Sequence, residues 1–344
     1  MHGLADQASA ISATGVSLPY EVRVNPYLEV SHEECEMWAR DMGMLRTDPP
    51  LSEGVWKPDR FRMIAVPELA AKIAPDANEA DLVLINQALV WIFAYDDYFT
   101  SAYKKSHDRQ GGWEYARRLC TFIHTDPGHP VPEPVDAVER GLADLWPRLA
   151  QGRSIRWRRD FSRAIHDFVT GAALELENIC DDRMPDLIDF IGLRRRTFAG
   201  GTGACFAAMA TGAEIPEALR ETEVVTSLLD AFIDVMALGN EAVSYDMEIN
   251  DEGEINNLLL VLRDIFGGGL DQAHKMATGL IEDRVRHFDH SVEVKLPRLS
   301  AEVSLSPSEV EQMKVWVRGA QSYLSGLYDW YDNTPRYRGD FHSA

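Results

Sequence analysis

The sequence is poor in basic residues for a chain of 344 residues. It has 34 lysines and arginines against 55 aspartates and glutamates, so its formal net charge at pH 7 is −21. A nucleic-acid binder normally carries a basic surface, and an anionic membrane attracts basic segments, so this balance argues against both partners. An acidic protein can still bind a phosphorylated molecule if metal ions supply positive charge locally.

The sequence also lacks closely spaced cysteines and long apolar runs. No two of the four cysteines form a C-x-x-C pattern, which argues against a zinc site or a disulfide framework and favours buried free thiols in a reducing cytoplasm. No run of about eighteen apolar residues is present, so we expect no stable membrane insertion. Residues 1–19 lack a basic segment followed by an apolar one, so we expect no signal peptide and a cytoplasmic location. The cysteines are Cys35, Cys120, Cys180 and Cys205.

Alternating polarity, the pattern of half-buried strands, is equally scarce, and residues 16–24 are the best candidate for an extended segment. Helical patterns dominate instead. Residues 81–99 are apolar on more than one face, which is typical of a helix in the middle of a bundle, and Asn78 is a candidate N-cap. Further helices are expected at residues 161–180, 185–196, 224–250, 255–266, 270–287 and 306–331.

These patterns predict a single all-α domain of about ten helices. With 45% hydrophobic residues, the chain can bury a sizeable core. We expect the domain at residues 25–338, between an N-terminal tail at 1–24 that is flexible or covers the active site and a C-terminal tail at 339–344. The glycines of residues 200–203 should break or kink the helix before them, and the two glycines of residues 111–112 favour an interhelical loop.

The most informative stretch is residues 240–248, Asn-Glu-Ala-Val-Ser-Tyr-Asp-Met-Glu. Asn240, Ser244 and Glu248 are four residues apart, so on an α-helix they share one face, each about 6 Å further along the axis. A carboxamide, a hydroxyl and a carboxylate on one stripe can hold Mg²⁺, with phosphate oxygens and waters completing the octahedron. The alternative is a polar face on which Ser244 hydrogen-bonds back to a carbonyl and Glu248 is solvated.

A second acidic element ends the central apolar helix, where Asp96 and Asp97 are adjacent. Such a pair is unusual, because buried charges need partners or metal ions and because the negative end of the helix dipole disfavours them. The alternative is a solvated helix end. The similar pair at residues 181–182 is better explained as a turn cap, because Pro185 follows it.

Two basic elements could bind phosphate. Arg194, Arg195 and Arg196 lie upstream of the acidic stripe, and arginine binds phosphate oxygens bidentately. The alternative is that this cluster is a solvated helix face. As few as one of the three arginine side chains would then point into the protein. Arg336 and Tyr337 follow the last expected helix.

The order of these elements resembles the motifs of bacterial-type class I terpene synthases (terpene cyclases): an aspartate-rich motif, a sensor arginine, an N-S-E triad and a terminal Arg-Tyr pair. The resemblance extends from about residue 25 to Tyr337 and implies a helical bundle of the class I terpenoid synthase type. It implies that Asp96 bridges two Mg²⁺ ions on one wall and that the 240–248 stripe chelates a third on the opposite wall. Mn²⁺ is the alternative metal.

The resemblance also assigns residues to the diphosphate. Arg194 best matches the diphosphate-sensing arginine, because it lies three residues before Thr197 in the pattern Arg-Arg-x-Thr. Arg336 and Tyr337 would bind the diphosphate when the site closes, and Asp97 would pair with Arg336.

The reaction implied by the resemblance is the ionisation of a linear isoprenyl diphosphate, with farnesyl diphosphate as first choice and geranylgeranyl diphosphate as second. The allylic cation would then become a cyclic hydrocarbon or alcohol, shielded from water and stabilised by aromatic faces. Ile92 and Phe93 lie one turn before the aspartates and should line the pocket. Phe198 and Trp330 are further candidates, and ordinary core packing is the alternative for all four.

Three positions depart from the family pattern. Thr100 stands where a last Asp or Glu is usual, Met247 stands where many relatives carry Lys or Arg, and Phe190 replaces a frequent tyrosine. One alternative is a chain-elongating prenyl transferase, but those enzymes usually carry two D-D-x-x-D motifs. A non-catalytic helical binding protein is the other alternative, and it does not account for the ordered motifs. Homodimers are common in such folds, although the sequence demonstrates no interface.

Overall fold

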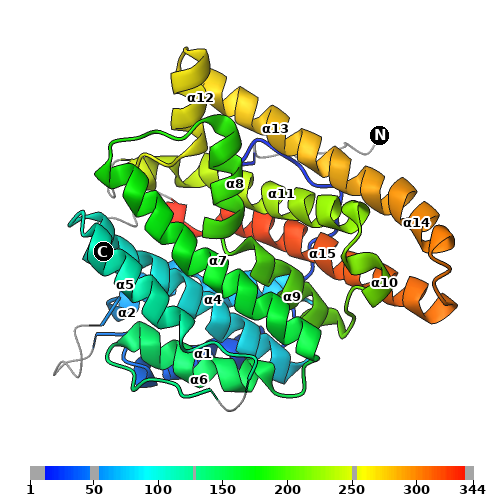
Figure 1. Cartoon of the computed structure of the whole chain (residues 1–344), viewed down its shortest axis with the longest axis horizontal. Coiled ribbons are helices and arrows are strands. Elements are labelled where there is room, and N and C mark those ends of the chain that lie inside the picture. Colours follow the sequence, from blue (N-terminus) through cyan, green and yellow to red (C-terminus); the bar gives the residue numbers. More distant parts are fainter. Residues whose placement is uncertain (1–11, 47–53, 127–128, 250–253, 338–344) are drawn as a thin grey trace, which may run out of the picture.

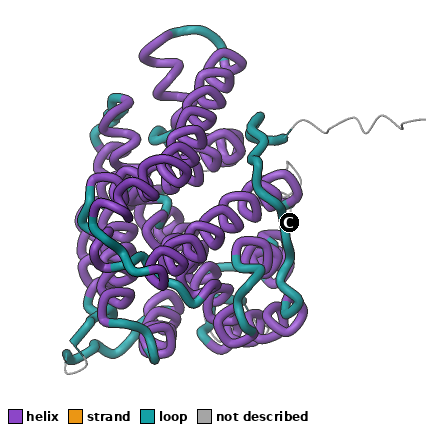
Figure 2. The backbone as a smooth tube through the Cα atoms, turned by 90° about the vertical axis from the view of Figure 1, so that its right-hand side faces the viewer, coloured by secondary structure: helices purple, strands orange, loops and turns teal. Residues whose placement is uncertain are grey.

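The computed structural model of the chain describes residues 12–46, 54–126, 129–249 and 254–337. As predicted, the domain is all-α: these residues contain no strand, and one isolated bridge joins Leu45 and Trp56. Figure 1 shows the helices packed as one bundle, and Figure 2 shows the loops that connect them. No helix in this part of the chain is both long and apolar enough to cross a bilayer.

The described residues form fifteen α-helices rather than about ten, because short helices occur near the N-terminus and beside the long ones. The helices are α1 (Leu28–Asp41), α2 (Pro58–Ile64), α3 (Val66–Ile73), α4 (Glu79–Phe99), α5 (Arg109–Cys120), α6 (Ala137–Ala150), α7 (Ile155–Cys180), α8 (Leu187–Thr197), α9 (Gly200–Thr211), α10 (Glu217–Arg220), α11 (Glu223–Met247), α12 (Leu258–Phe266), α13 (Leu270–His290), α14 (Leu296–Glu302) and α15 (Pro307–Asn333). Short π-helical turns follow α4 and α13, as η1 (Thr100–Lys104) and η3 (Ser291–Lys295), and η4 (Pro335–Tyr337) is a 3₁₀ turn.

Helix α4 is the centre of one half of the bundle. The predicted N-cap is confirmed, because the side-chain oxygen of Asn78 accepts a hydrogen bond from the backbone N–H of Asp81 at 3.0 Å. Helices α1, α3, α6 and α9 all pack against α4. This surrounding explains why its apolar residues cover more than one face.

The break between α8 and α9 differs from the prediction. It lies at Ala199, whose backbone is left-handed (φ 55°, ψ 27°), and Gly200 and Gly203 are inside α9. The glycines instead allow α9 to approach α11. A Cβ on Gly200 would overlap Ile233, and one on Gly203 would lie 3.2 Å from Met236.

The prediction of an interhelical loop at residues 111–112 is wrong, because both glycines lie in the first turns of α5. Asp108 caps this helix by accepting a hydrogen bond from the backbone N–H of Gly111 at 2.9 Å. A Cβ on Gly112 would overlap Leu176 of α7, so the glycine is needed for the contact between α5 and α7.

The described part of the predicted N-terminal tail, residues 12–24, is a loop that lies along α13 and α15 (Figure 1). The hydroxyl of Tyr20 donates a hydrogen bond to Asp289 at 2.6 Å, and the hydroxyl of Ser325 donates one to the carbonyl of Glu21 at 3.0 Å. None of these tail residues lines the main cavity.

All four cysteines are free thiols, as predicted, but only two of them are buried. Cys35 and Cys205 lie in the core, whereas Cys120 and Cys180 are partly exposed.

Candidate functional site

The main cavity lies among α4, α7, α8, α11 and α15, and the space free of protein atoms there is about 970 Å³, open solvent included. Its lining runs from Leu89 to Asp96 along α4 and from Phe168 to Glu175 along α7. Seven residues of α-helix span about 10.5 Å along the axis. Asp96 and Glu175 lie at one end of these stretches, which we call the mouth, and Leu89 and Phe168 lie at the other, which we call the floor. The floor residues are Leu69, Leu89, Phe168, Tyr323 and Leu327.

Asp96 is half-buried in the cavity wall, in the last turn of α4. No hydrogen bond from the described residues reaches its carboxylate. Burial raises the pKa of Asp96 to about 6, and the positive charges of Lys104 and Arg336 offset only part of this effect. A carboxylate without a donor at a helix C-terminus is favourably placed to bind a cation.

The predicted stripe lines the same cavity, with Asn240 and Ser244 on α11 and Glu248 directly after it. The hydroxyl of Ser244 donates a hydrogen bond to the carbonyl of Asn240 at 2.9 Å, as expected if the stripe were only a polar helix face. A polar helix face would also leave Glu248 solvated, and it is not. It is half-buried, it accepts a hydrogen bond from the Asn257 amide at 2.9 Å, and burial raises its pKa.

The chemistry of these donors fits a hard divalent cation, since all of them present oxygen. In the ranges that the structure describes, no three His, Cys, Asp or Glu side chains converge closely enough to hold a metal ion by themselves. A cation at Asp96 or at the stripe therefore needs further oxygen ligands from phosphate or water. Mg²⁺ prefers this kind of coordination.

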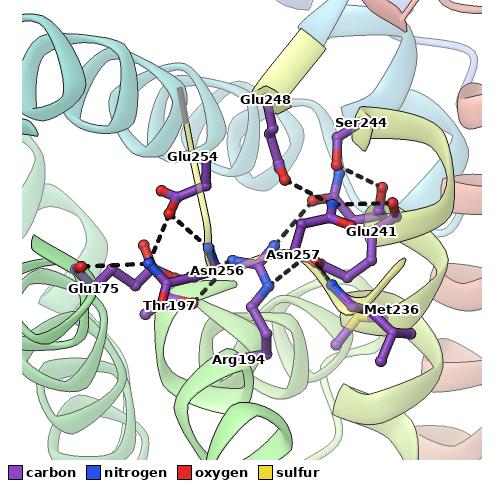
Figure 3. A network of polar contacts seen from close by, with 12 residues as sticks. Glu175, Arg194, Thr197, Met236, Glu241, Ser244, Glu248, Glu254, Asn256 and Asn257 are labelled. Carbon is purple, nitrogen blue, oxygen red and sulfur yellow. Dashed lines mark hydrogen bonds and ion pairs between the residues drawn. The ribbon is translucent and has the colours of Figure 1, made fainter. Parts of the chain in front are cut away.

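Arg194 is the arginine of the cluster that enters the cavity (Figure 3). Its guanidinium donates hydrogen bonds to Thr197 at 2.9 Å and to the Asn240 carboxamide oxygen at 3.1 Å. It also forms ion pairs with Glu241 at 2.5 Å and with Glu175 at 3.5 Å. Burial disfavours the charge, but these two carboxylates outweigh it and raise the pKa of Arg194, so the guanidinium stays charged.

The other two arginines of the cluster point elsewhere. Arg195 forms two hydrogen bonds, of 2.7 and 2.8 Å, to the buried carboxylate of Asp234 and one of 2.7 Å to Asp230, which ties α8 to α11. Arg196 donates to the hydroxyl of Thr170 on α7 at 2.9 Å. The two neighbours of Arg194 thus hold α8 against the helices on either side.

The terminal Arg-Tyr pair closes the cavity mouth from η4. The hydroxyl of Tyr337 accepts a hydrogen bond from the Asn240 amide at 2.9 Å, so η4 contacts the acidic stripe directly. Arg336 is buried, with its guanidinium carbon 4.8 Å from the centre of the Phe93 ring.

Asp97 lies outside the cavity lining, because one residue turns an α-helix by about 100°. As the resemblance implies, it pairs with Arg336, at 3.3 Å. Its other oxygen accepts a hydrogen bond from the Trp56 indole at 2.6 Å and lies 3.6 Å from Arg60. Asp97 therefore holds Arg336 from behind the cavity wall.

The four residues that the sequence assigns to the substrate pocket line this cavity: Ile92, Phe93, Phe198 and Trp330. The rings of Phe93 and Trp330 are 5.9 Å apart and tilted by 59°.

Sequence reasoning missed three ionic residues in the lining: Lys104, Glu175 and Glu254. Each lies outside the four recognised motifs. A buried lysine paired with two glutamates has no signature in one sequence, because the three positions are far apart in the chain.

Residues 87–287, more than half of the chain, match the model of a family described as terpene synthase family 2, C-terminal metal binding. This range includes Asp96, Arg194 and the 240–248 stripe. It does not include Arg336 and Tyr337.

Relatives along nearly the whole chain carry related descriptions. The pentalenene synthase of Streptomyces avermitilis is 25% identical, over 94% of this chain and 93% of its own. The 4-epi-cubebol synthase of Streptosporangium roseum, described as cyclising (2E,6E)-farnesyl diphosphate, is 27% identical over 95% and 92%. The crystal structure of germacradien-4-ol synthase from Streptomyces citricolor has a similar fold, with a TM-score of 0.79, 20% identity and coverage of 92% of this chain and 98% of its own.

Proposed function

The chain belongs to terpene synthase family 2 and is a class I terpene synthase, and we propose that it converts farnesyl diphosphate into a cyclic hydrocarbon or alcohol in a Mg²⁺-dependent reaction. Geranylgeranyl diphosphate is the second choice of substrate. One observation carries the proposal: Asp96, the 240–248 stripe, Arg194 and Arg336 all line the mouth of one cavity whose floor is apolar.

The proposed metal-binding residues are Asp96 on one wall and Asn240, Ser244 and Glu248 on the other. Three Mg²⁺ ions are expected, with Mn²⁺ as the alternative. When bound, Mg²⁺ supplies a positive charge that stabilises the negative charge developing on the departing diphosphate.

The chain's own donors act on the same group. Arg194 is held charged, and Arg336 and Tyr337 reach the mouth from η4, so the three can donate hydrogen bonds to diphosphate oxygens. These interactions strengthen as charge moves from the C–O bond onto the leaving group. Departure of the diphosphate leaves an allylic cation, and this first step requires no general base.

The apolar part of the cavity then protects the cation. Phe93, Phe198 and Trp330 line it, and an aromatic face stabilises a nearby cation by about 0.5–2 kcal/mol. Their packing also excludes water, which would otherwise capture the cation early.

The depth of the cavity supports farnesyl diphosphate as substrate. An extended chain advances about 1.2 Å per bond, since an extended backbone residue of three bonds spans about 3.5 Å. The farnesyl main chain is then about 13 Å long and must bend to fit a depth of about 10.5 Å, which brings its far double bond towards the cation. On the same scale, a geranyl chain of about 8 Å fits extended and a geranylgeranyl chain of about 18 Å has to fold back on itself.

The proposal is tested by incubating the purified chain with geranyl, farnesyl and geranylgeranyl diphosphate in the presence of Mg²⁺. Mass spectrometry of the organic extract should show a hydrocarbon or alcohol from farnesyl diphosphate that disappears with EDTA and returns with excess Mg²⁺. No metal-dependent product from any of the three would refute the proposal. A longer prenyl diphosphate, formed only with isopentenyl diphosphate, would identify a prenyl transferase instead.

The proposed role of Glu248 has a sharper test. Glu248→Gln removes a charged ligand, so we expect turnover to fall about a hundredfold or more while the helical CD signal stays unchanged. Asp246→Asn is the matched control, because Asp246 is exposed on the same stretch and should keep nearly full turnover. Near-normal turnover of Glu248→Gln would contradict the assignment.

A further inference from the structure

Lys104 is a buried cation to which the proposed reaction gives no role. Its ammonium nitrogen lies 2.8 Å from Glu175 and 2.7 Å from Glu254, and all three residues line the cavity. Burial disfavours the charge, but the two carboxylates raise the pKa of Lys104 well above its usual value. The lysine is therefore charged and held between two elements that are far apart in the sequence.

Glu254 begins a short segment, residues 254–257, which we call the strap. The second oxygen of Glu254 accepts hydrogen bonds from the backbone N–H groups of Ile255 and Asn256, each at 2.9 Å, so the carboxylate shapes the strap from inside. On the α7 side, the carboxamide oxygen of Asn256 accepts a hydrogen bond from Asn178 at 2.7 Å.

On the α11 side, the strap holds Glu248. The Asn257 amide donates a hydrogen bond to the Glu248 carboxylate at 2.9 Å, and the next backbone N–H, that of Leu258, donates to Glu241 at 2.9 Å. Figure 3 shows Asn256 and Asn257 lying between Glu254 on one side and Glu241 and Glu248 on the other. The orientation of one proposed metal ligand thus depends on where the strap lies.

A π-helical turn directs Lys104 towards the cavity. In a regular α-helix, Lys104 would follow Asp97 by seven residues and share its direction, away from the cavity. The turn η1 uses about one residue more than an α-helical turn, so Lys104 takes the direction that position 103 would otherwise have. That direction lies about 20° from that of Asp96, which explains how both side chains reach the same wall.

We propose that Lys104 is a positioning residue: through Glu254 it holds the strap, and through the strap it keeps Glu248 directed across the cavity towards the Asp96 wall. The inference rests on the proposed function, because it assigns Glu248 to a metal ion. Lys104, the strap and Glu248 thus connect the two proposed metal-binding walls through protein contacts, from α4 and η1 to the end of α11.

The arrangement of charges supports a holding role. Glu175 is shared between Lys104 and Arg194, since its two oxygens lie 2.8 and 3.5 Å from the respective cations. Two of the three ammonium protons of Lys104 are taken up by glutamates, so the side chain is fixed rather than free to follow a ligand. Removing Lys104 would leave the two buried carboxylates uncompensated, and neutralising Glu254 would remove the charge that attaches the strap to Lys104, so we expect the strap to be held less firmly in either case.

The test compares Lys104→Met and Glu254→Gln with the matched control Lys105→Met, in which the adjacent, exposed lysine is changed. Glu254→Gln keeps an acceptor for the strap's own N–H groups and leaves the pair between Lys104 and Glu175, so we expect it to fold even if Lys104→Met does not. Hydrogen–deuterium exchange of the ligand-free full chain reports on the strap. Isothermal titration with MgCl₂ and inorganic diphosphate reports on the metal site without turnover.

We expect strap amides to exchange about tenfold faster in both test variants and the Mg²⁺ concentration for half-saturation to rise about tenfold, with no change in Lys105→Met. The double variant should show no more than the larger single effect, and Lys104→Arg should restore part of the binding. Unchanged strap exchange, or unchanged Mg²⁺ dependence in Glu254→Gln, overturns the inference. A wild-type chain that binds Mg²⁺ and diphosphate but converts no prenyl diphosphate would refute the proposed function and leave this inference standing.

Discussion

Replacing Asp234 with asparagine should separate the support of Arg194 from the stability of the bundle. Asp234 is buried on α11, accepts two hydrogen bonds from Arg195 and forms an ion pair with Arg284 of α13 at 2.9 Å. The change removes the charge that holds α8 in place but leaves the side chain nearly the same size. Arg194 directly precedes Arg195 on α8, so its position in the cavity depends on this contact.

The expected magnitude follows from burial. Breaking a fully buried ion pair costs about 3–5 kcal/mol, but the side chains of Arg195 and Arg284 remain 31% and 24% exposed, which reduces the loss to about 2 kcal/mol. A chain of 344 residues has an unfolding entropy of about 0.7 kcal/mol per kelvin, so Tm should fall by about 3 °C. A displacement of Arg194 by about 1 Å can reduce kcat/KM by as much as a hundredfold.

Asp230→Asn is the control for this prediction. Asp230 contacts the same guanidinium at 2.7 Å from one turn earlier on α11, but its side chain is 38% exposed. An exposed pair contributes about 0–1 kcal/mol, so Tm and kcat/KM should hardly change. Calorimetry gives Tm and steady-state kinetics give kcat/KM for both variants. Equal losses in the two variants, or full activity in Asp234→Asn, would show that the buried contact does not position Arg194.

Three further substitutions have expected outcomes. Gly239→Ala places a Cβ 2.5 Å from the hydroxyl of Tyr328 on α15. We therefore expect the free energy of unfolding to fall by about 1–3 kcal/mol and Tm, measured by calorimetry, to fall by about 1.5–4 °C. Leu89→Trp shortens the cavity from its floor, so the ratio of kcat/KM for farnesyl to geranyl diphosphate should fall about tenfold. Trp56→Phe removes the indole donor of Asp97, which should lower Tm by about 2–4 °C and reduce kcat/KM because Arg336 is held less firmly.

The glycine and tryptophan substitutions each have a control elsewhere in the chain. Gly192→Ala lies inside α8 with open space around it and should be neutral or stabilising by up to about 1 kcal/mol. Trp38→Phe removes a similar bond, from an indole to Asp144 at 2.8 Å on α6, and should lower Tm without changing kcat/KM. A substrate ratio that stays constant in Leu89→Trp would show that the floor does not select chain length.

Helical periodicity was sufficient to predict the all-α fold and to place Asn240, Ser244 and Glu248 on one face of one helix. It could not decide which arginine of the cluster enters the cavity. That choice depends on the rotation of α8 about its axis, and the rotation is set by Asp234 on α11 and Thr170 on α7. Such partners are tertiary, and a single sequence does not identify them.

The errors in helix boundaries have a local cause. The sequence signal at residues 200–203 was glycine content, which commonly indicates a helix end, whereas these glycines serve close packing of α9 on α11. The actual break is at Ala199, a residue with high helix propensity. Lys104 was missed for a related reason, because a π-helical turn changes which face a residue occupies and leaves no periodic trace.

The contacts of Asp97 have a consequence for how the chain can be divided. Trp56 comes from the segment before α2, Arg336 comes from η4, and both meet at this one carboxylate. A fragment cut to residues 87–287, the range of the family match, would keep the proposed metal ligands and lose both of these partners. The early and late parts of the chain must therefore both be present for Arg336 to be held at the mouth of the cavity, so we expect such a fragment to be inactive.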